Sequence, residues 1–494
     1  MKKVCLILAA VLLMTMTQAA FADSSDGKFE EKDSLNVVYL GGSITQGAGI
    51  NMSDGEKCWV QLVSDYFTSK YPKTKVNNYN VGVGGTPSEF GLARLEADVM
   101  SKKPDVVFVE FAVNDQYGGT AETNHKNVIA NMEGIVRNLM SMDSVPYIIF
   151  VYTTQYYNNT MYYDCSEWHQ EVADNYGIPS IDLQPVVEKY LSDHTGSSIT
   201  DVLGDNVHPN ALGYKLYAEE IIAKLETGDY YKKPKKEAEW LTQETEKRYD
   251  YIMRSVKLTD KNFDESFADG SNGAYIGLSL GTVGKVSNVP GSEMALDFYG
   301  NAVGIQTRIG SDCGFARVEI DGETVAKLSS YVNTSGKTSP RLTYLNRNLS
   351  DGMHHLRIVV LPDKDKNTDT KIWIDRIFVA DGVCDYTSGL AVSAKLLNLQ
   401  AEALGSVTAS EMNIIELTVK NENDEDVSEE ILCAVYGSDN KLKGISRLPV
   451  EIEADSYKKF GIGQRIAVEG NWIKLMQWDS LNGLKPIYKG MLFK

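Results

Sequence analysis

The sequence has little proline for its length, and outside its first residues it has no long apolar run. With 13 prolines among 494 residues, 43% hydrophobic residues and 23% charged residues, it is neither disordered nor collagen-like. No later apolar run approaches the ~20 residues that a membrane-spanning helix needs. A chain of this length instead predicts about three globular domains.

An excess of positive charge is also absent. The formal net charge is −18 at pH 7, so the surface repels phosphate backbones and anionic lipid headgroups. We therefore expect no nucleic-acid partner, no membrane-surface partner and no polyanionic substrate.

Cysteine is sparse, and its pattern does not form a disulfide framework. After Cys5 in the N-terminal segment, the other five are Cys58, Cys165, Cys313, Cys384 and Cys433. Cys313 and Cys384 flank one predicted domain and could pair in an oxidising compartment, whereas small buried thiols are the alternative. No pair has the C-x-x-C or zinc-finger spacing of a metal site.

The first 22 residues are typical of a secretory signal peptide. Lys2 and Lys3 give a positive start, residues 4–16 are apolar but too short to span a bilayer, and Ala20-Phe21-Ala22 fits a cleavage site. We expect cleavage near Ala22 and a secreted product that is not anchored to a membrane.

Residues 30–228 alternate strand and helix signals. Strand-like runs, most of them apolar, lie at 35–40, 76–81, 105–111, 146–152 and 179–183, and helix-like segments lie at 56–71, 87–103, 123–142 and 210–225. Nearly continuous apolar strands separated by helices predict a parallel sheet that is covered on both faces. We predict a five-stranded, doubly wound α/β domain.

The pattern changes after this domain. Residues 229–251 are charged and indicate a solvated linker with a helix. From residue 252 apolar residues alternate, as in Ala316, Val318 and Ile320, and a similar pattern continues beyond residue 386. We predict two antiparallel β-sandwich domains, a jelly-roll-like one over 252–385 and an immunoglobulin-like one over 386–494.

Four clusters of glycine or polar residues lie at strand ends of the first predicted domain or just before its last helix. They contain Ser43, Gly82–Gly85, Asn114-Asp115 and Asp205–Pro209. The carboxyl ends of the strands in a doubly wound sheet meet at one crevice, where ligands bind. We therefore expect the four clusters to come together.

These residue types suit nucleophilic catalysis. His208 can take the proton of the Ser43 hydroxyl, and Asp205, three residues earlier, can hold the histidine ring. The backbone N–H groups of Ser43 and Gly85 and the side-chain amide of Asn114 can stabilise an oxyanion. The clusters thus predict a Ser-His-Asp triad with a three-donor oxyanion hole.

The clusters resemble, in order and in content, the sequence blocks of the SGNH/GDSL hydrolase superfamily over about residues 35–225. Ser43, Gly85, Asn114 and His208 match its block residues, and Asp205–Pro209 matches its Asp-x-x-His-Pro block. The resemblance implies a flavodoxin-like three-layer fold and a serine esterase that uses neither metal nor cofactor.

Two positions depart from the usual blocks. The first block reads Gly-Gly-Ser-Ile-Thr instead of Gly-Asp-Ser-Leu, and Ala112 stands where the third block usually has glycine. Both variants are similar to those of SGNH carbohydrate esterases. An α/β-hydrolase is the rival, but Thr45 occupies the position where its Gly-x-Ser-x-Gly elbow needs the second glycine.

A tyrosine-rich stretch follows the fourth predicted strand, and we expect it at the rim of the crevice. Tyrosine and amide side chains suit the faces and hydroxyls of sugars. The candidate substrate contacts are Tyr152, Gln155, Tyr156, Tyr157 and Trp168. Alternatively, this loop packs its tyrosines on the domain surface or against the neighbouring sandwich.

The other candidate ligands have a simpler interpretation. His125, His169 and His194 have no aspartate at matched spacing, so we expect them in loops or at the surface. Residues 363–369 resemble a calcium loop, but Thr368 replaces its glycine and Ile374 its bidentate glutamate, so we predict no metal site.

The sequence therefore predicts a secreted serine esterase that removes small acyl groups, acetyl above all, from polysaccharide or oligosaccharide. A lipid-directed SGNH acylhydrolase, such as a lysophospholipase or thioesterase, is an alternative that would need an apolar acyl groove. A non-catalytic glycan-binding protein is another, and the complete set of serine, glycine, asparagine, aspartate and histidine argues against it.

Overall fold

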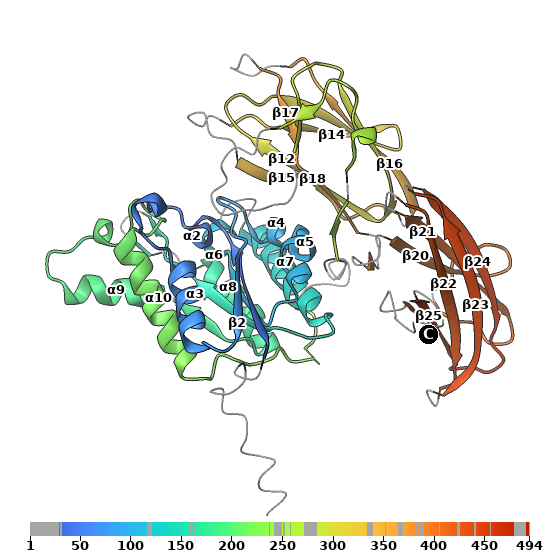
Figure 1. Cartoon of the computed structure of the whole chain (residues 1–494), viewed down its shortest axis with the longest axis horizontal. Helices are drawn as coiled ribbons and strands as arrows, with labels where there is room; N and C mark the ends of the chain where they lie inside the picture. The colour runs from blue at the N-terminus through green and yellow to red at the C-terminus, as the bar shows by residue number, and fades with distance from the viewer. Residues whose placement is uncertain are drawn as a thin grey trace, which may run out of the picture. The chain divides into compact units, whose positions relative to one another are not determined.

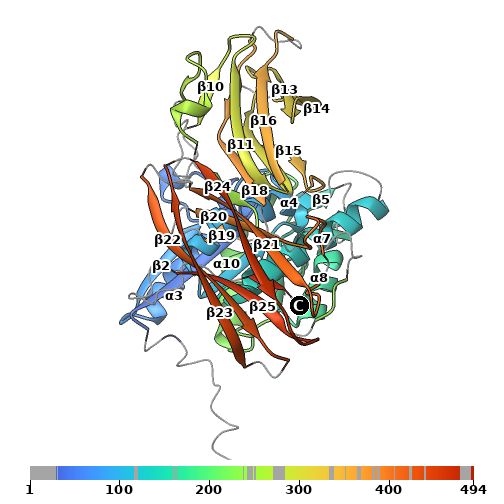
Figure 2. The ribbon, with the colours of Figure 1, turned by 90° about the vertical axis from the view of Figure 1, so that its right-hand side faces the viewer.

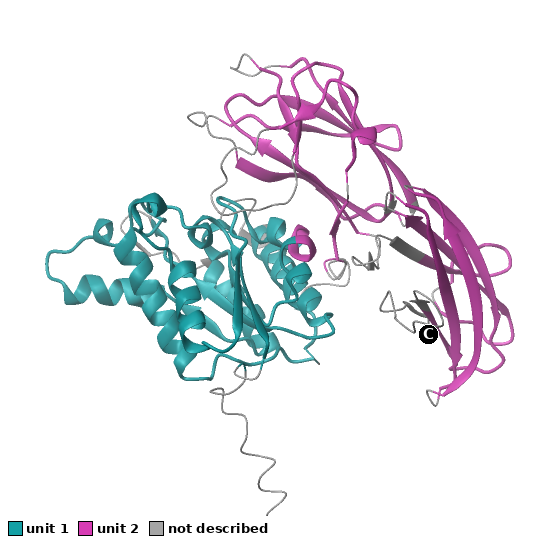
Figure 3. Cartoon of the chain, in the orientation of Figure 1, with its two compact units in different colours: residues 1–92, 98–247, 276–278 teal, residues 93–97, 248–275, 279–494 magenta. Residues whose placement is uncertain are grey.

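The computed structural model describes residue 29 and residues 32–115, 121–157, 160–161, 164–236, 238–241, 249, 252–256, 258–270, 284–332, 339–350, 352–363, 369–380, 384–385, 390–404, 406–421, 425–438, 441–454, 456–478 and 491–493. The chain divides into two compact units (Figures 1 and 3), formed mainly by residues 1–92 with 98–247 and by residues 248–275 with 279–494. The predicted signal peptide, residues 1–22, lies outside the described residues.

A parallel five-stranded sheet is the centre of the first unit. Its strands are β1 (Ser34–Gly41), β2 (Lys75–Asn80), β3 (Val106–Glu110), β4 (Tyr147–Tyr152) and β7 (Ser180–Asp182). Their order is β2-β1-β3-β4-β7, so the direction of winding reverses between β1 and β3. The doubly wound fold predicted from the sequence is confirmed, and β1 and β3 flank the switch point at which such sheets bind ligands.

Helices cover both faces of this sheet. The longer ones are α3 (Trp59–Lys70), α7 (Ala121–Met140), α8 (Asp164–Tyr176), α9 (Gln184–Asp193) and α10 (Ala211–Glu226). Helix α10 packs against α3 and α9, whereas α7 packs against α8 (Figures 1 and 2). Side chains of α3, α9 and α10 bury one face of the sheet, to which β1, β3, β4 and β7 contribute apolar residues, whereas β2 is rich in asparagine and only partly buried.

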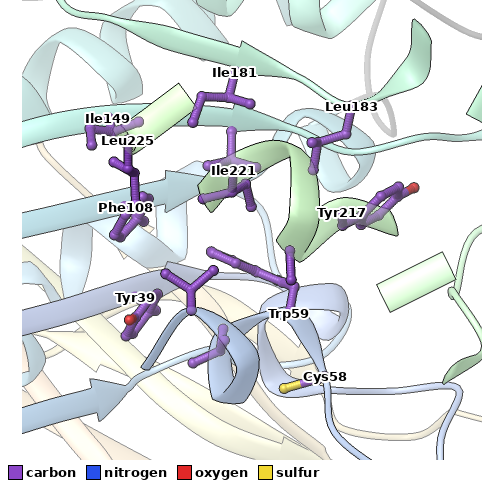
Figure 4. Close-up of a cluster of buried hydrophobic side chains, with 14 of the residues drawn as sticks. Tyr39, Cys58, Trp59, Phe108, Ile149, Ile181, Leu183, Tyr217, Ile221 and Leu225 are labelled. Atoms are coloured by element: carbon purple, nitrogen blue, oxygen red, sulfur yellow. The ribbon is translucent and has the colours of Figure 1, made fainter. Parts of the chain in front are cut away.

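An aromatic cluster fixes this packing (Figure 4). The ring of Tyr39 on β1 stacks on Phe108 of β3 at 5.2 Å between centroids, and Trp59 of α3 meets Tyr39 edge-on at 5.5 Å. All three side chains are fully buried. The cluster locks β1 and β3 side by side, directly below the loops that carry Ser43 and Asn114.

The first unit differs from prediction in its helices. The expected helix over 87–103 is divided into α4 (Ser88–Ala93), α5 (Leu95–Asp98) and a 3-10 turn. The sequence analysis missed α8 and α9 altogether. Helix α8 is rich in residues of modest helix propensity, and α9 has proline in its first turn, so neither gave a clear helical signal.

The chain after α10 is less solvated than predicted. Tyr231 is buried in the core of the first unit, and the N–H of Lys235 donates to the carbonyl of Tyr176 at 2.7 Å. Farther on, Arg137 of α7 lies over the ring of Trp240 at 4.1 Å. Residues 231–235 therefore pack as irregular chain between turns, and most of the segment 237–248, in which a helix was expected, lies outside the described residues.

The first half of the second unit consists of antiparallel strands. The first sheet has the strand order β11 (Glu293–Gly300), β16 (Gly352–Val360), β13 (Phe315–Ile320) and β14 (Glu323–Ser329). The second sheet has the order β15 (Ser339–Asn346), β12 (Ala302–Ile309), β18 (Arg376–Ala380) and β8 (Arg254–Ser255). A smaller third sheet has the order β17 (Ile372–Ile374), β10 (Lys285–Ser287) and β9 (Ala268–Asp269). The alternating Ala316, Val318 and Ile320 are buried between the sheets as predicted.

The second half has its own core. One of its sheets has the strand order β19 (Cys384–Asp385), β20 (Leu390–Leu397), β21 (Met412–Asn421) and β24 (Tyr457–Arg465). The other has the order β23 (Leu442–Ile452), β22 (Val427–Tyr436), β25 (Trp472–Trp478) and β26 (Met491–Phe493). Antiparallel β-sandwich architecture after the α/β domain is thus confirmed. The domain boundaries and the jelly-roll-like and immunoglobulin-like assignments stay predictions.

The thiols follow the simpler of the two interpretations. Cys313 is buried and forms no disulfide among the described residues, so the pairing of Cys313 with Cys384 is not present. Burial raises the pKa of the Cys313 thiol to about 12, which makes it an inert packing residue. In the described part of the chain, no helix is long and apolar enough to cross a membrane.

Candidate active site

Ser43 is the first residue of the short helix α2 (Ser43–Gln46), which begins directly after β1. Its side chain is largely buried, with 9% exposure for the residue as a whole. The hydroxyl of Tyr214, on α10, lies 3.1 Å from the carbonyl oxygen of Ile44 and 2.6 Å from that of Ala48. The turn that carries Ser43 is therefore tied to the core of the domain.

A continuous hydrogen-bonded chain links Ser43, His208 and Asp205. The Nε2 atom of His208 lies 2.8 Å from Oγ of Ser43, and its Nδ1 atom lies 2.7 Å from Oδ2 of Asp205. Ser43 and His208 are 165 positions apart in the sequence. The contacts expected from the sequence clusters are present, in the geometry that proton transfer from a serine hydroxyl requires.

Asp205 is arranged to stay ionised. Its Oδ1 accepts from the backbone N–H groups of Val207 and His208, both at 2.7 Å. Partial burial alone would raise the pKa of Asp205, but the hydrogen bonds from the His208 ring and from these two N–H groups outweigh it and lower the pKa. At neutral pH the carboxylate can therefore orient the imidazole and stabilise its cation.

The loop that holds Asp205 and His208 is tight. The N–H of Gly204 donates to the carbonyl of His208 at 2.8 Å, and Leu203 pairs with Pro209. Gly49 runs against the other side of this loop, where a Cβ would come within 3.0 Å of the His208 Cβ. This fixed loop and the absence of a side chain at Gly49 set the position of the imidazole.

The glycine cluster after β2 lies along the turn that carries Ser43. The N–H of Gly84 donates to Oε1 of Gln46 at 2.8 Å, and a Cβ on Gly84 would lie 3.5 Å from the Ser43 Cβ. Gly85 follows with a φ of 67°, the left-handed region that favours glycine. The close approach to Ser43 thus comes from Gly84, while Gly85 turns the exposed chain beside it.

Asn114, in the short helix α6 (Ala112–Asp115), reaches the residue next to Ser43. A Cβ on Gly42 would overlap the amide nitrogen of Asn114. An aspartate at position 42, as in the usual Gly-Asp-Ser block, would displace this amide. Gly42 is therefore the departure that lets the amide lie beside the Ser43 backbone.

We predict that Gly42→Ala lowers kcat on a short aryl ester by about 10²-fold, because the new methyl group pushes away an oxyanion donor. Asn114→Ala should cost about the same, and the double variant should lose no more than Asn114→Ala alone, since both act on one amide. Steady-state kinetics on the three variants measures this. The control is Gly444→Ala, whose kcat should equal that of wild type because a Cβ at this position meets nothing within 4 Å. A Gly42→Ala enzyme with unchanged kcat would contradict the prediction.

His169 contradicts its sequence prediction. It is completely buried on α8, and its Nε2 atom lies 2.8 Å from Oδ2 of Asp115, whose Oδ1 accepts from the N–H of Ser88 at 2.7 Å. The partner aspartate is 54 positions away, so local spacing could not reveal it. The pair joins α4, α6 and α8, and it anchors the helix that carries Asn114.

The other two histidines are nearer to expectation. His125 on α7 is partly exposed and lies 3.0 Å from Oε1 of Glu171. His194 is exposed and caps the end of α9.

Two of the five candidate substrate contacts are not at a rim. Tyr152 is 3% exposed, and its hydroxyl donates to Oε1 of Gln170 at 3.1 Å. Gln155 is 6% exposed and lines a small internal cavity together with Thr153 and Cys165. The expectation that these two side chains face a substrate is wrong, because β4 and the residues after it stay inside the domain.

The three remaining candidates are less enclosed. Tyr156, in the two-residue strand β5 (Tyr156–Tyr157), is half-buried, and its N–H donates to the carbonyl of Asn206 at 2.9 Å. The hairpin therefore touches the loop of Asp205 and His208. The side chain of Tyr157 lies outside the described part of the structure. Trp168 is half-buried on α8, with its ring 5.1 Å from that of His125.

Sequence reasoning missed the polar residues beneath Ser43. The side chain of Asn80 donates to the carbonyl of Thr45 at 2.8 Å and accepts from the N–H of Gly82 at 2.9 Å. Glu110, at the end of β3, is buried against Thr45 and Gly42. The one signal that could have identified Glu110 is an acidic residue within an otherwise apolar strand.

No group of three histidine, cysteine, aspartate or glutamate side chains in the described ranges could hold a metal ion. The arrangement of Ser43, His208, Asp205 and Asn114 can by itself supply a nucleophile, a base and an anion-stabilising donor.

Comparison with known proteins identifies a family for the first unit. Residues 39–216 match the model of the GDSL-like lipase/acylhydrolase family. The matched segment contains all four clusters predicted to form the site. No curated protein matches the sequence.

Solved structures with a similar fold include a two-domain esterase. This two-domain esterase (CEX) is active on acetylated mannans and was co-crystallized with mannopentaose, and its sequence is 21% identical to this one. The superposition has a TM-score of 0.55 and covers 75% of this chain and 94% of the esterase chain. A second structure of that esterase has 22% identity and a TM-score of 0.54, with the same coverage. A catalytic mutant of Axe2, an acetylxylan esterase from Geobacillus stearothermophilus, is 21% identical with a TM-score of 0.33, covering 40% and 96%.

Proposed function

Residues 39–216 belong to the GDSL-like lipase/acylhydrolase family and the protein is a carboxylic ester hydrolase; from this premise we propose that it removes acetyl or similarly small acyl groups from polysaccharide or oligosaccharide. The observation that carries the proposal is the hydrogen-bonded chain from Ser43 through His208 to Asp205.

In the proposed reaction the Ser43 oxygen attacks the ester carbonyl while His208 Nε2 takes the hydroxyl proton. His208 then gives this proton to the departing sugar oxygen, which leaves an acyl group on Ser43. A water molecule that gives a proton to His208 attacks the acyl carbonyl, and the bond to the Ser43 oxygen then breaks as that oxygen takes the proton back from His208 and the carboxylic acid departs. Throughout, Asp205 holds the ring by Nδ1 and stabilises its positive charge.

The negative charge on the tetrahedral intermediate needs fixed donors. We assign this role to the backbone N–H groups of Ser43 and Gly85 and to the side-chain amide of Asn114. Support comes from the amide nitrogen of Asn114 beside Gly42 and from the glycine loop that runs along Ser43. Since Asp115 is bonded to His169 and Ser88, the Asn114 donor is held in place before substrate binds.

The carbohydrate substrate is the less constrained part of the proposal. The shared fold with a two-domain esterase active on acetylated mannans, over 75% of this chain, supports it. The half-buried rings of Tyr156 and Trp168 can offer a sugar part of an apolar face. Secretion, directed by the leader-like residues 1–22, is part of the same proposal.

Chain length separates the acetyl-ester proposal from a lipid-directed acylhydrolase. We expect hydrolysis of aryl esters to fall steeply beyond about four acyl carbons, because a small acyl site would have no room for burying further methylenes at ~0.8 kcal/mol each. Initial rates on an acetate-to-decanoate series measure this, beside acetate release from acetylated mannan and xylan. Activity that rises steadily to the longest chain would instead support the lipid-directed function.

A further inference from the structure

Glu110 is a buried acid that the proposed reaction does not use. It is 1% exposed at the carboxyl end of β3, where it is the register partner of Gly41 on β1. Its position is therefore directly below the turn that leads to Ser43. A buried carboxyl group without a cation partner is costly, so its surroundings call for an explanation.

Both oxygens of Glu110 accept hydrogen bonds from defined donors. Oε2 accepts from the hydroxyl of Thr45 at 2.8 Å and from the N–H of Gly42 at 3.4 Å. Oε1 accepts from the hydroxyl of Thr153 at 3.1 Å. The Gly42 N–H also lies 3.2 Å from the backbone carbonyl of Glu110. One oxygen thus binds the serine turn from below, and the other binds the chain after β4.

The glycines of the turn leave space for this arrangement. A Cβ on Gly41 would overlap the Thr45 hydroxyl and would come within 2.8 Å of the Glu110 carbonyl oxygen. Gly41, Thr45 and Glu110 therefore form a single packing unit. This unit accounts for the threonine of the Gly-Gly-Ser-Ile-Thr block, whose hydroxyl serves as a donor to the buried acid.

We infer that Glu110 is a positioning residue: its carboxylate holds Gly42 and Thr45 on either side of Ser43, and so fixes the Ser43 oxygen and backbone N–H for attack. The inference rests on the proposed function and adds a residue that touches neither substrate nor His208. Since Gly42 directly precedes Ser43 and Thr45 follows it by two residues in the same helical turn, a small shift of either would move both the nucleophile and an oxyanion donor.

Ionisation decides how firmly Glu110 holds the turn. Burial raises the pKa of Glu110 from its ordinary 4.5 to about 7, although the bonds from Thr45, Thr153 and the Gly42 N–H act in the opposite direction. The N–H of Gly42 can only donate, so a proton on the acid belongs on Oε1, where Thr153 can turn to accept it. Protonation thereby converts charge-assisted bonds to the serine turn into weaker neutral ones.

Among the described residues, the two phenols that interact with Glu110 keep their charge in this pH range. From α10, Tyr214 and Tyr217 interact electrostatically with it, and burial raises the pKa of both phenols, that of Tyr217 to about 12. The hydroxyls of Thr45 and Thr153 do not titrate. His208 reaches the same turn through Ser43 and is kept in every variant compared below.

Glu110→Gln is the direct test, because glutamine keeps the shape and an acceptor oxygen for the turn but imitates the protonated acid at every pH. Near pH 8.5 we expect kcat about tenfold below wild type, with KM little changed. The ratio of wild-type to variant kcat should fall to about one near pH 5.5, with its midpoint at about pH 7.

A ratio that is constant with pH, or a variant as active as wild type at high pH, overturns the inference. Glu133→Gln is the matched control: Glu133 is also fully buried in the first unit, but its Oε1 binds Tyr176 and the N–H of Leu241 instead of the serine turn. Its kcat ratio to wild type should not change with pH.

A stability measurement distinguishes failure of this inference from failure of the proposed function. Because the pKa of Glu110 is higher in the folded than in the unfolded state, its stabilising effect is complete below about pH 4.5 and is lost as pH rises through about 7. The Tm of wild type should therefore fall relative to Glu110→Gln over that interval. If this Tm difference appears but no hydrolysis depends on Ser43, Glu110 titrates as described and the proposed function is wrong. If the Tm curves of wild type and Glu110→Gln are parallel across this pH range, the inference about Glu110 is wrong.

Discussion

Replacing Ser43 by alanine is expected to lower kcat for ester hydrolysis by about 10⁵–10⁶-fold, while the protein still folds. The change removes the oxygen proposed to form the acyl-enzyme. It deletes a single atom at the end of β1, and the hydrogen bond it loses is the one to His208. Initial rates on an aryl acetate, together with the Tm, measure both parts of the prediction.

The control for this variant is Ser192→Ala, which removes an exposed hydroxyl that donates to the carbonyl of Lys189 on α9. It should hydrolyse esters like wild type. A Ser43→Ala protein that keeps wild-type activity would disprove the nucleophile assigned here, and the first unit would then be better described as a binding module.

Replacing Asp205 by asparagine should lower kcat by about 10³–10⁴-fold. Asparagine can still accept the two backbone N–H bonds of the loop through its carbonyl oxygen, so the loop should keep its shape. Its NH₂ group then faces Nδ1 of His208 and favours the wrong tautomer, and the charge that stabilises the imidazolium is gone. Because the Asp205 side chain is 58% exposed, we expect little change in Tm.

Asp193→Asn is the matched control, since Asp193 is similarly exposed at 52% and bonds Lys189 on the surface of α9. Its kinetics should equal those of wild type. If Asp205→Asn retained more than about a tenth of wild-type kcat, Asp205 would not be the residue that orients the histidine.

The geometry of the catalytic set could be anticipated because it depends on local order and one topological rule. Ser43 and Asn114 each follow a strand of a parallel sheet, and Asp205 and His208 share one short loop. Once the apolar strands indicated a doubly wound sheet, their carboxyl ends had to meet. Spacing within each cluster then fixed which side chains could reach one another.

Burial of single polar side chains could not be anticipated in the same way. His169 is buried because Asp115, 54 positions earlier, lies opposite it, and Glu110 is buried because Thr45, 65 positions earlier, donates to it. Tyr152 continues β4 into the interior, although its neighbours suggested an exposed tyrosine-rich loop. Such pairings depend on the packing of distant segments, which alternation and composition do not contain.

The departure of the serine block from Gly-Asp-Ser-Leu has a structural reason. Gly42 leaves room for the Asn114 amide, and Gly41 leaves room for the Thr45 hydroxyl that binds Glu110. The block Gly-Gly-Ser-Ile-Thr is therefore matched to an acid on β3 and an amide on α6. A change at one of these positions should require a change at another, which is a stronger constraint than the serine alone imposes.

The most direct test of the central claim is to trap the acyl-enzyme. Rapid acid quenching of the enzyme during turnover of an aryl acetate, followed by proteolysis and mass spectrometry, should find one acetyl group on the peptide that contains Ser43, and none in the Ser43→Ala protein. An acetyl group on another residue, or rapid turnover with no acetylated peptide at any time, would contradict the mechanism.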